Sequence, residues 1–257
     1  MATIIDMSTS HLADYTLSLA DNSMILGQRL GEWCGHGPIL EQDIALTNIA
    51  LDLIGEARSL YQYVAELEGE GKTEDDYPFT RDVKLWKNLL LVEQPNEDFA
   101  YTIVRQCLFD IYHYHLLKEL QNSTDERLAA IAAKSIKEVT YHLKYSSEWM
   151  VRLGDGTAES KQKMQAAMDD RIRFFHEAFI PTATEKAAAD FGIGVAVEQL
   201  ADPCTQMLSD ICERATLTVP EVPYPQKGGK TGMHSEHMGF ILADLQYLQK
   251  TYPDSQW

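Results

Sequence analysis

The sequence lacks the short motifs that identify a complete metal or nucleotide site. None of its eight histidines has a glutamate three residues upstream, and the nearest approach is Asp110, three residues before His113. A four-helix bundle that holds two metal ions uses Glu-x-x-His on two helices and a single Glu on each of the others. The chain also has no Walker A motif, dinucleotide fingerprint or nucleophile elbow. It therefore carries no full signature of a catalytic centre.

Cysteines and basic residues are also few. The four cysteines (Cys34, Cys107, Cys204 and Cys212) have neither zinc-knuckle nor disulfide-framework spacing, which is typical of reduced thiols in a cytoplasmic protein. Lysine and arginine number 22 against 39 acidic residues, a net charge of −17. This balance excludes nucleic-acid binding through a general basic surface, favours solubility or docking to a basic partner, and demands a local basic patch for any anionic ligand.

Long apolar runs are absent as well. No stretch approaches the roughly 20 apolar residues of a membrane span, and the first sixteen residues have no basic segment or apolar run that would indicate a signal peptide. The 257 residues show no break in composition, so we expect a single helical domain over 1–257.

What the sequence does contain is helical periodicity almost throughout. On 40–68, for example, Ile49, Leu53, Leu60 and Val64 recur at helical steps. The pattern predicts four long helices in two consecutive pairs and four shorter helices after them, the all-α, ferritin-like four-helix bundle with additional C-terminal helices. The long helices are predicted over 11–34, 40–68, 97–121 and 125–153, and the appended ones over 157–179, 184–191, 203–216 and 235–250.

Capping and turn residues set these boundaries. Asn96 is predicted to cap the third long helix, and Ser123-x-x-Glu126 has the form of a capping box for the fourth. Residues 70–80 are predicted to be an acidic loop and 86–91 a short helix.

Ligand-type side chains gather on the predicted third and fourth helices. Asp110 and His113 share one helix face, and Glu138 and His142 share another. Such inward carboxylates and imidazoles could supply half a metal site. A hydrogen-bonded polar network is the more common role for such groups, because unpaired buried charges cost several kcal/mol. On this interpretation they pair with one another, or with Arg58 and Lys137.

The first two helices offer less to a metal. Met24 stands at the centre of the candidate line on the first helix, and the second provides Asn48, Asp52 and Glu56 with Arg58 nearby. A fixed cation there would repel ferrous iron and neutralise leftover carboxylates.

Two motifs lie near the C-terminus. His234-Ser-Glu-His237 resembles a metal cluster but implies no third ligand, so a capping or interface role is favoured. Lys227-Gly-Gly-Lys230 is a rare basic spot ahead of a helix, which makes Lys227 and Lys230 candidates for binding a phosphate, although a flexible loop is the simpler interpretation.

Several segments together resemble a known family. They match the C-subunit family of the bacterial phenylacetyl-CoA (ring 1,2-) epoxidases, and the likeness covers nearly the whole chain. The segments are SMILGQRLGEWCGHGP, IALDLIGEARSLYQYVAELEGEG, LLLVEQPNEDFAYTIVRQ, KEVTYHLKYS and GGKTGMHSEHMGFILADLQYLQ.

This resemblance implies a diverged paralogue of a catalytic di-iron subunit. Where the catalytic subunit has Ser-Glu-Ile-Val-Gly, this chain has Met24 in the ligand position. Where it has Glu-Gly-Gly-His, this chain reads Gly55-Glu56-Ala57-Arg58, and the histidine becomes Arg58 or, one residue later, Ser59. The degenerate ligand positions are therefore Met24, Gly55 and Arg58, with Asp110, Glu138 and His142 left as a polar remnant.

The resemblance also implies partners. The chain would be a structural, non-catalytic subunit that stabilises the di-iron subunit in aerobic phenylacetate breakdown, holds no cofactor itself, and assembles with a small bridging subunit and an NADPH-dependent reductase. Two alternatives stay open: a metal-binding oxygenase subunit with a residual site at Asp110, His113, Glu138 and His142, and a free-standing helical binding module.

Overall fold

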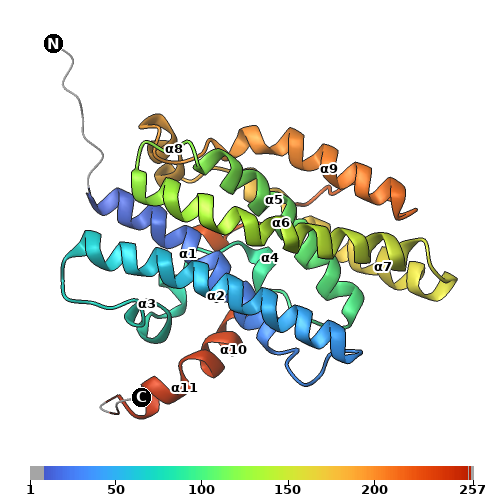
Figure 1. Ribbon diagram of the computed structural model, residues 1–257, viewed down its shortest axis with the longest axis horizontal. Coiled ribbons are helices and arrows are strands. Elements are labelled where there is room, and N and C mark those ends of the chain that lie inside the picture. Colours follow the sequence, from blue (N-terminus) through green and yellow to red (C-terminus); the bar gives the residue numbers. More distant parts are fainter. Residues whose placement is uncertain (1–8, 254, 256–257) are drawn as a thin grey trace.

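Four long helices form the centre of the computed structural model, which describes residues 9–253 and 255 (Figure 1). The helices pack as two consecutive pairs, α1 with α2 and α5 with α6, and α2 also contacts α6. The described residues contain no β-strand, so the predicted all-α, ferritin-like bundle with appended helices is confirmed. The long helices are α1 (Thr9–Gly31), α2 (Leu40–Glu68), α5 (Phe99–Leu120) and α6 (Glu126–Gly154).

Shorter elements fill the crossover between the pairs and the C-terminal third. The crossover contains α3 (Asp76–Thr80), the 3-10 turn η1 (Val83–Leu85) and α4 (Leu90–Glu93). In the C-terminal part α7 and α9 pack against α5 and α6, while α8 and α10 pack against α1. The remaining elements are α7 (Ala158–Arg171), η2 (Ile172–Phe179), α8 (Ala183–Asp190), η3 (Val197–Leu200), α9 (Ala201–Arg214), η4 (Gly229–Thr231), α10 (Glu236–Leu245) and α11 (Tyr247–Thr251).

Several predicted boundaries differ from the structure. The first helix ends at Gly31, the predicted helix over 157–179 changes from α to 3-10 geometry after Arg171, and the last one divides into α10 and α11. The predicted loop 70–80 contains α3, residues 86–89 are extended rather than helical, and α9 begins at Ala201 rather than 203. Of the first sixteen residues, on which the signal-peptide prediction depends, residues 1–8 lie outside the described range. In that range, no helix is long and apolar enough to cross a membrane.

Aspartates, rather than the predicted residues, cap the second pair of long helices. Asp98 accepts hydrogen bonds from two amides of the first turn of α5, and Asp125 accepts one from the Leu128 amide at 2.9 Å. Asn96 donates instead to the Arg29 carbonyl at 2.8 Å, and the Ser123 hydroxyl donates to the Ile193 carbonyl at 2.6 Å. The Asn96 and Ser123 side chains make tertiary contacts instead, and in each case the aspartate two residues later caps the helix.

The end of the crossover is held by three buried arginines from three different helices. Arg105 is fully buried, and burial together with the charges of Arg29 and Arg171 lowers its pKa to about 9. Each guanidinium group donates to a backbone carbonyl of this segment, and Arg29 and Arg171 also pair with the carboxylates of Glu32 and Asp170. The pairs are Arg29 with the Glu93 carbonyl, Arg105 with the Gln94 carbonyl and Arg171 with the Pro95 carbonyl.

Gly27 lets α1 and α2 approach closely. A Cβ built on Gly27 would lie 2.9 Å from Ile54 Cγ1 and 3.2 Å from the Ala50 carbonyl oxygen, whereas one on Gly31 would meet nothing within 4 Å. The close approach of the two helices therefore requires the glycine at position 27 and not the one at position 31. In the middle of α2, Gly55 is exposed, and its Cβ would also meet nothing within 4 Å.

The same substitution at these two glycines should therefore have opposite effects. Gly55→Ala should raise the free energy of unfolding by about 0.5–1 kcal/mol, because alanine is the better residue in a helix interior. Gly27→Ala should lower it by about 1–3 kcal/mol through overpacking. Urea denaturation of both variants measures this, and equal signs would contradict the close packing at Gly27.

Candidate functional site

The centre of the bundle holds an ion pair between an acid and an imidazole. Glu56 of α2 and His113 of α5 lie 2.9 Å apart (Oε1 to Nε2), and both side chains are 4% exposed. The Ser23 hydroxyl of α1 donates to the same carboxylate at 2.7 Å. Glu56 is positioned by helical periodicity, since it lies three residues after Leu53 and four before Leu60 on the buried side of α2.

The electrostatics of Glu56 show that this pair is well matched. Burial raises the pKa of the carboxyl, but the His113 ring, with hydrogen bonds from His113, Ser23 and Ser135, outweighs that effect and holds the pKa below its ordinary value. Side chains from all four long helices therefore meet at one carboxylate, and the negative charge is compensated inside the protein.

Asp110 lies fully buried on the same helix as His113, but its partners are neutral. Its two carboxylate oxygens accept hydrogen bonds from Gln106 Nε2 and from the Ser146 hydroxyl, both at 2.7 Å. Burial is the largest influence and raises the pKa of Asp110 to about 6, against the lowering effects of His142 and these hydrogen bonds. Asp110 is thus satisfied by an amide and a hydroxyl rather than by a cation.

The seam between α2 and α6 holds a second acid–imidazole pair. His142 Nε2 lies 3.0 Å from Asp52 Oδ2, with His142 1% and Asp52 36% exposed. Glu138 is half-buried beside this pair and makes no hydrogen bond or ion pair with the described residues. Burial and then the neighbouring Asp52 raise the pKa of Glu138.

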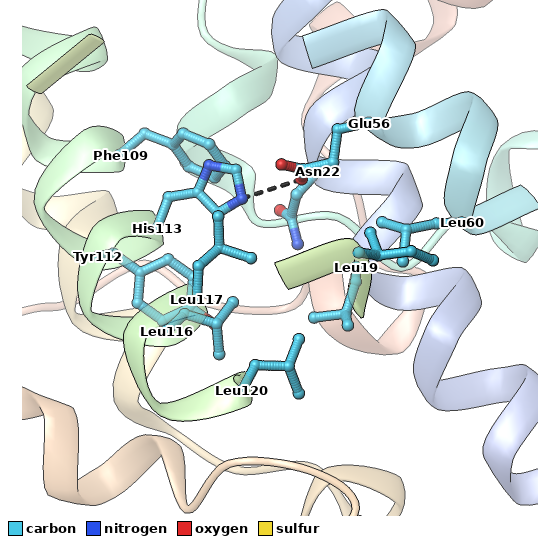
Figure 2. A pocket seen from close by; sticks show the side chains of 11 residues that line it. Leu19, Asn22, Glu56, Leu60, Phe109, Tyr112, His113, Leu116, Leu117 and Leu120 are labelled. Carbon is cyan, nitrogen blue, oxygen red and sulfur yellow. Dashed lines mark ion pairs between the residues drawn. The ribbon is translucent and has the colours of Figure 1, made fainter. Parts of the chain in front are cut away.

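A small cavity adjoins the central pair (Figure 2). Its volume is about 10 Å³, enough for at most one water molecule. Figure 2 shows the Glu56–His113 pair at one end and a lining of leucines, including Leu19, Leu60 and Leu116. This cavity therefore has no room for an organic substrate next to the pair.

The residues proposed as a residual metal site lie near one another in the bundle, but three of the four are engaged by other partners. His113 pairs with Glu56, His142 pairs with Asp52, and Asp110 is held by Gln106 and Ser146. The Nδ1 atoms of both histidines have no hydrogen-bond partner in the described structure, yet among these residues no group of three or more His, Cys, Asp and Glu side chains is placed to hold a metal ion. The set does not fit a di-iron centre.

Three expectations about the first two helices need correction. Arg58 neutralises no interior carboxylate: its side chain is 66% exposed and pairs with Glu74 at 2.9 Å. Gly55 is exposed on the outer side of α2, so Glu56, one residue later, is the interior position. Met24 is buried in the hydrophobic core as an apolar residue, but its neighbour Ser23 is the side chain that contacts Glu56.

The expected pairing within the polar remnant also differs. Asp110 and His142 do not pair with each other or with Glu138, and exposed Lys137 makes no ion pair with a described residue. Asp110 is instead held by Ser146, and His142 by Asp52. Sequence periodicity places these residues on their helices but does not predict which of them face each other across helices.

The C-terminal basic loop already surrounds an anion of the protein itself. Glu177 accepts hydrogen bonds from the amides of Gly228 (2.6 Å), Lys230 (3.4 Å) and Leu90 (2.8 Å). The Lys230 amine pairs with Glu185 at 2.8 Å, and its side chain is only 8% exposed. Lys227 is exposed. The amides and the lysine that a phosphate would need at Lys230 are thus occupied by carboxylates.

His234 likewise serves a tertiary contact rather than a metal. Its Nδ1 lies 2.5 Å from Glu93 Oε1 and its Nε2 lies 3.0 Å from the Trp86 carbonyl. The Ser235 amide and hydroxyl donate to the other Glu93 oxygen at 2.8 and 2.6 Å. This motif therefore joins α10 to the crossover, and helix capping by the Ser235 side chain is not observed.

Comparison with known proteins identifies the family of the chain. The family described as phenylacetic acid catabolic protein matches residues 1–257. This chain belongs to the phenylacetic acid catabolic protein family. A relative from Escherichia coli (strain K12), the C subunit of 1,2-phenylacetyl-CoA epoxidase, is 49% identical over 248 residues, which cover 96% of this chain and 100% of that protein. The resemblance found in the sequence segments is confirmed over nearly the full length.

The central ion pair of this family member should behave as a unit. His113→Leu leaves Glu56 buried without its partner and should lower the free energy of unfolding by about 3–5 kcal/mol. The double variant Glu56→Leu/His113→Leu removes both charges and should lose less than His113→Leu alone. Denaturant titrations at neutral pH measure both variants together with Glu56→Leu. A loss in the double variant equal to the sum of the two single losses would show that the residues are not coupled.

Asp110 should make stability depend on pH. Its pKa rises from 3.8 to about 6 on folding, so its contribution is complete below the lower value and is lost as the pH rises through about 6. Asp110→Asn imitates the protonated form. It should be about 1–3 kcal/mol more stable than the parent protein at pH 7.5 and close to it at about pH 3.5 to 4. Urea denaturation at both pH values tests this, and a variant no more stable at pH 7.5 would contradict it.

Proposed function

We propose that this chain is the structural, non-catalytic subunit of a bacterial, cytoplasmic, multicomponent phenylacetyl-CoA 1,2-epoxidase in aerobic phenylacetate catabolism. The relative from Escherichia coli is named as the C subunit of such an epoxidase, and that name implies an assembly of several chains. The expected partners are a ferritin-like di-iron subunit that carries the chemistry, a small bridging subunit and a reductase.

One observation supports the non-catalytic role most directly. Glu56 and His113, the ligand-type residues at the centre of the bundle, are joined to each other, and the cavity beside them holds about one water molecule. An oxygenase centre needs open metal positions and space for its substrate. The bundle interior here is instead filled by polar side chains that are held by one another, which suits a scaffold that stabilises a paralogous subunit.

Co-expression with the catalytic subunit of the same host tests the proposal. We expect that subunit to be soluble and active in epoxidation with this chain, and to lose most of its soluble yield or its activity without it. Iron analysis of this chain purified alone is expected to give far less than one iron per chain. About two bound irons, lost in Glu56→Ala, would overturn the non-catalytic role. Undiminished activity without this chain would overturn the scaffold role.

A further inference from the structure

One broad side of the bundle is formed by α2 and α6, and the outer surface of α2 is left to solvent there. The two helices run beside each other in Figure 1 and are joined by the His142–Asp52 pair and by a 2.6 Å hydrogen bond from the Tyr145 hydroxyl to Gln42. The C-terminal helices α7, α8, α9 and α10 pack elsewhere, against α1, α5 and the edge of α6.

The outer surface of α2 carries a row of exposed apolar side chains. Leu40, Ile44 and Leu51 are 71%, 51% and 61% exposed. Their spacing of four and seven residues puts them on one side of the helix. Single exposed apolar residues are ordinary, but an aligned row of large ones on a long helix marks an interaction surface.

Gly55 continues this row, four residues after Leu51. No atom of the described chain comes within 4 Å of a Cβ built there, so nothing inside the protein requires a glycine. Glycine weakens a helix interior relative to alanine, and its usual benefit is the close approach of another backbone. Because no part of the described chain uses this position, it is open to the close approach of a helix from another molecule.

The neighbouring surface of α6 is basic. Lys134, Lys137 and Lys144 are exposed at spacings of three and seven residues, and none forms an ion pair with a described residue. In a chain of net charge −17, three unpaired lysines on one helix form a local positive strip. Such a strip favours an acidic partner surface. A second copy related by a two-fold axis would bring the same lysines toward one another, which disfavours self-association here.

We propose that an acidic helix of the catalytic epoxidase subunit docks on this surface, which we call the α2–α6 face. The face is defined by Leu40, Ile44, Leu51 and Gly55 of α2 and by Lys134, Lys137 and Lys144 of α6. The assignment rests on the proposed function and adds the place and the chemistry of the contact. The apolar row supplies the buried area, Gly55 permits close helix packing, and the lysines set orientation and speed of association.

Charge reversal tests the lysine strip. The full-length chain is titrated with the purified catalytic subunit of the same host, with affinity measured by biolayer interferometry at about 0.1 M salt, where the Debye length is about 10 Å. K134E/K137E/K144E should weaken binding by about tenfold or more, an effect reduced at high salt. The control K118E/K161E/K186E changes the net charge equally at exposed lysines of α5, α7 and α8 and should leave the affinity unchanged.

Gly55→Ala tests the close approach independently of charge. It should raise the thermal midpoint of the isolated chain yet weaken binding of the catalytic subunit, by about tenfold. Gly31→Ala is the matched control, because its Cβ also meets nothing within 4 Å but lies at the end of α1. The control should leave binding unchanged. A gain in stability with a loss of association cannot arise from misfolding.

The remaining outcomes separate the two proposals. If the parent protein binds the catalytic subunit and neither the lysine reversal nor Gly55→Ala weakens that binding, the α2–α6 face is overturned and the proposed function stands. If the parent protein does not bind the catalytic subunit, the proposed function is overturned, and this assignment with it. If the isolated chain dimerises and the same variants abolish its dimer, the occupant is a second copy and the acidic partner is overturned.

Discussion

A carboxylate in the middle of a helical bundle must meet a positive charge or a set of hydrogen-bond donors, and in this protein the donors come from the protein itself. Glu56 meets His113 at 2.9 Å and the Ser23 hydroxyl at 2.7 Å, which ties α1, α2 and α5 together at one point. In a di-metal bundle a cation of the centre would play this part. Here an imidazole takes it, so the helices can close on a small cavity rather than around a site.

The same solution recurs outside the bundle centre. Glu93 is held by His234 and Ser235, and Glu177 is held by three backbone amides. Conversely, the buried arginines of α1, α5 and α7 each donate to a carbonyl of the crossover. These internal contacts attach the crossover and the C-terminal third to the bundle. They also explain why two motifs that resemble ligand sites, one histidine-rich and one basic, are engaged within the chain.

Sequence periodicity was sufficient to predict the bundle and the residues on each helix face, because local spacing determines both. It was insufficient to predict which side chains pair between different helices. Arg58 was expected inside the bundle, yet it follows Glu56 by two residues, which corresponds to about 200° of rotation on a helix and places Arg58 in solvent and Glu56 in the core. Asp52 was identified as a candidate, but its pairing with His142 spans 90 residues of sequence. The carboxylate that occupies the Lys230 loop, Glu177, lies in a segment with no distinguishing motif. Family membership added the functional context that these contacts alone do not provide.

The long-range contacts that hold the end of the crossover have a consequence for the order of folding. The segment from Glu93 to Asn96 is held by Arg29, 64 residues before Glu93, and by His234, 141 residues after it. Loop-closure entropy must be overcome before such distant contacts can form, so we expect local helix pairs to assemble first and this segment to settle late. A nascent chain that still lacks His234 and Ser235 would leave the Glu93 carboxylate without two of its partners. A segment synthesised after all four long helices is therefore needed to complete the connection between the two helix pairs.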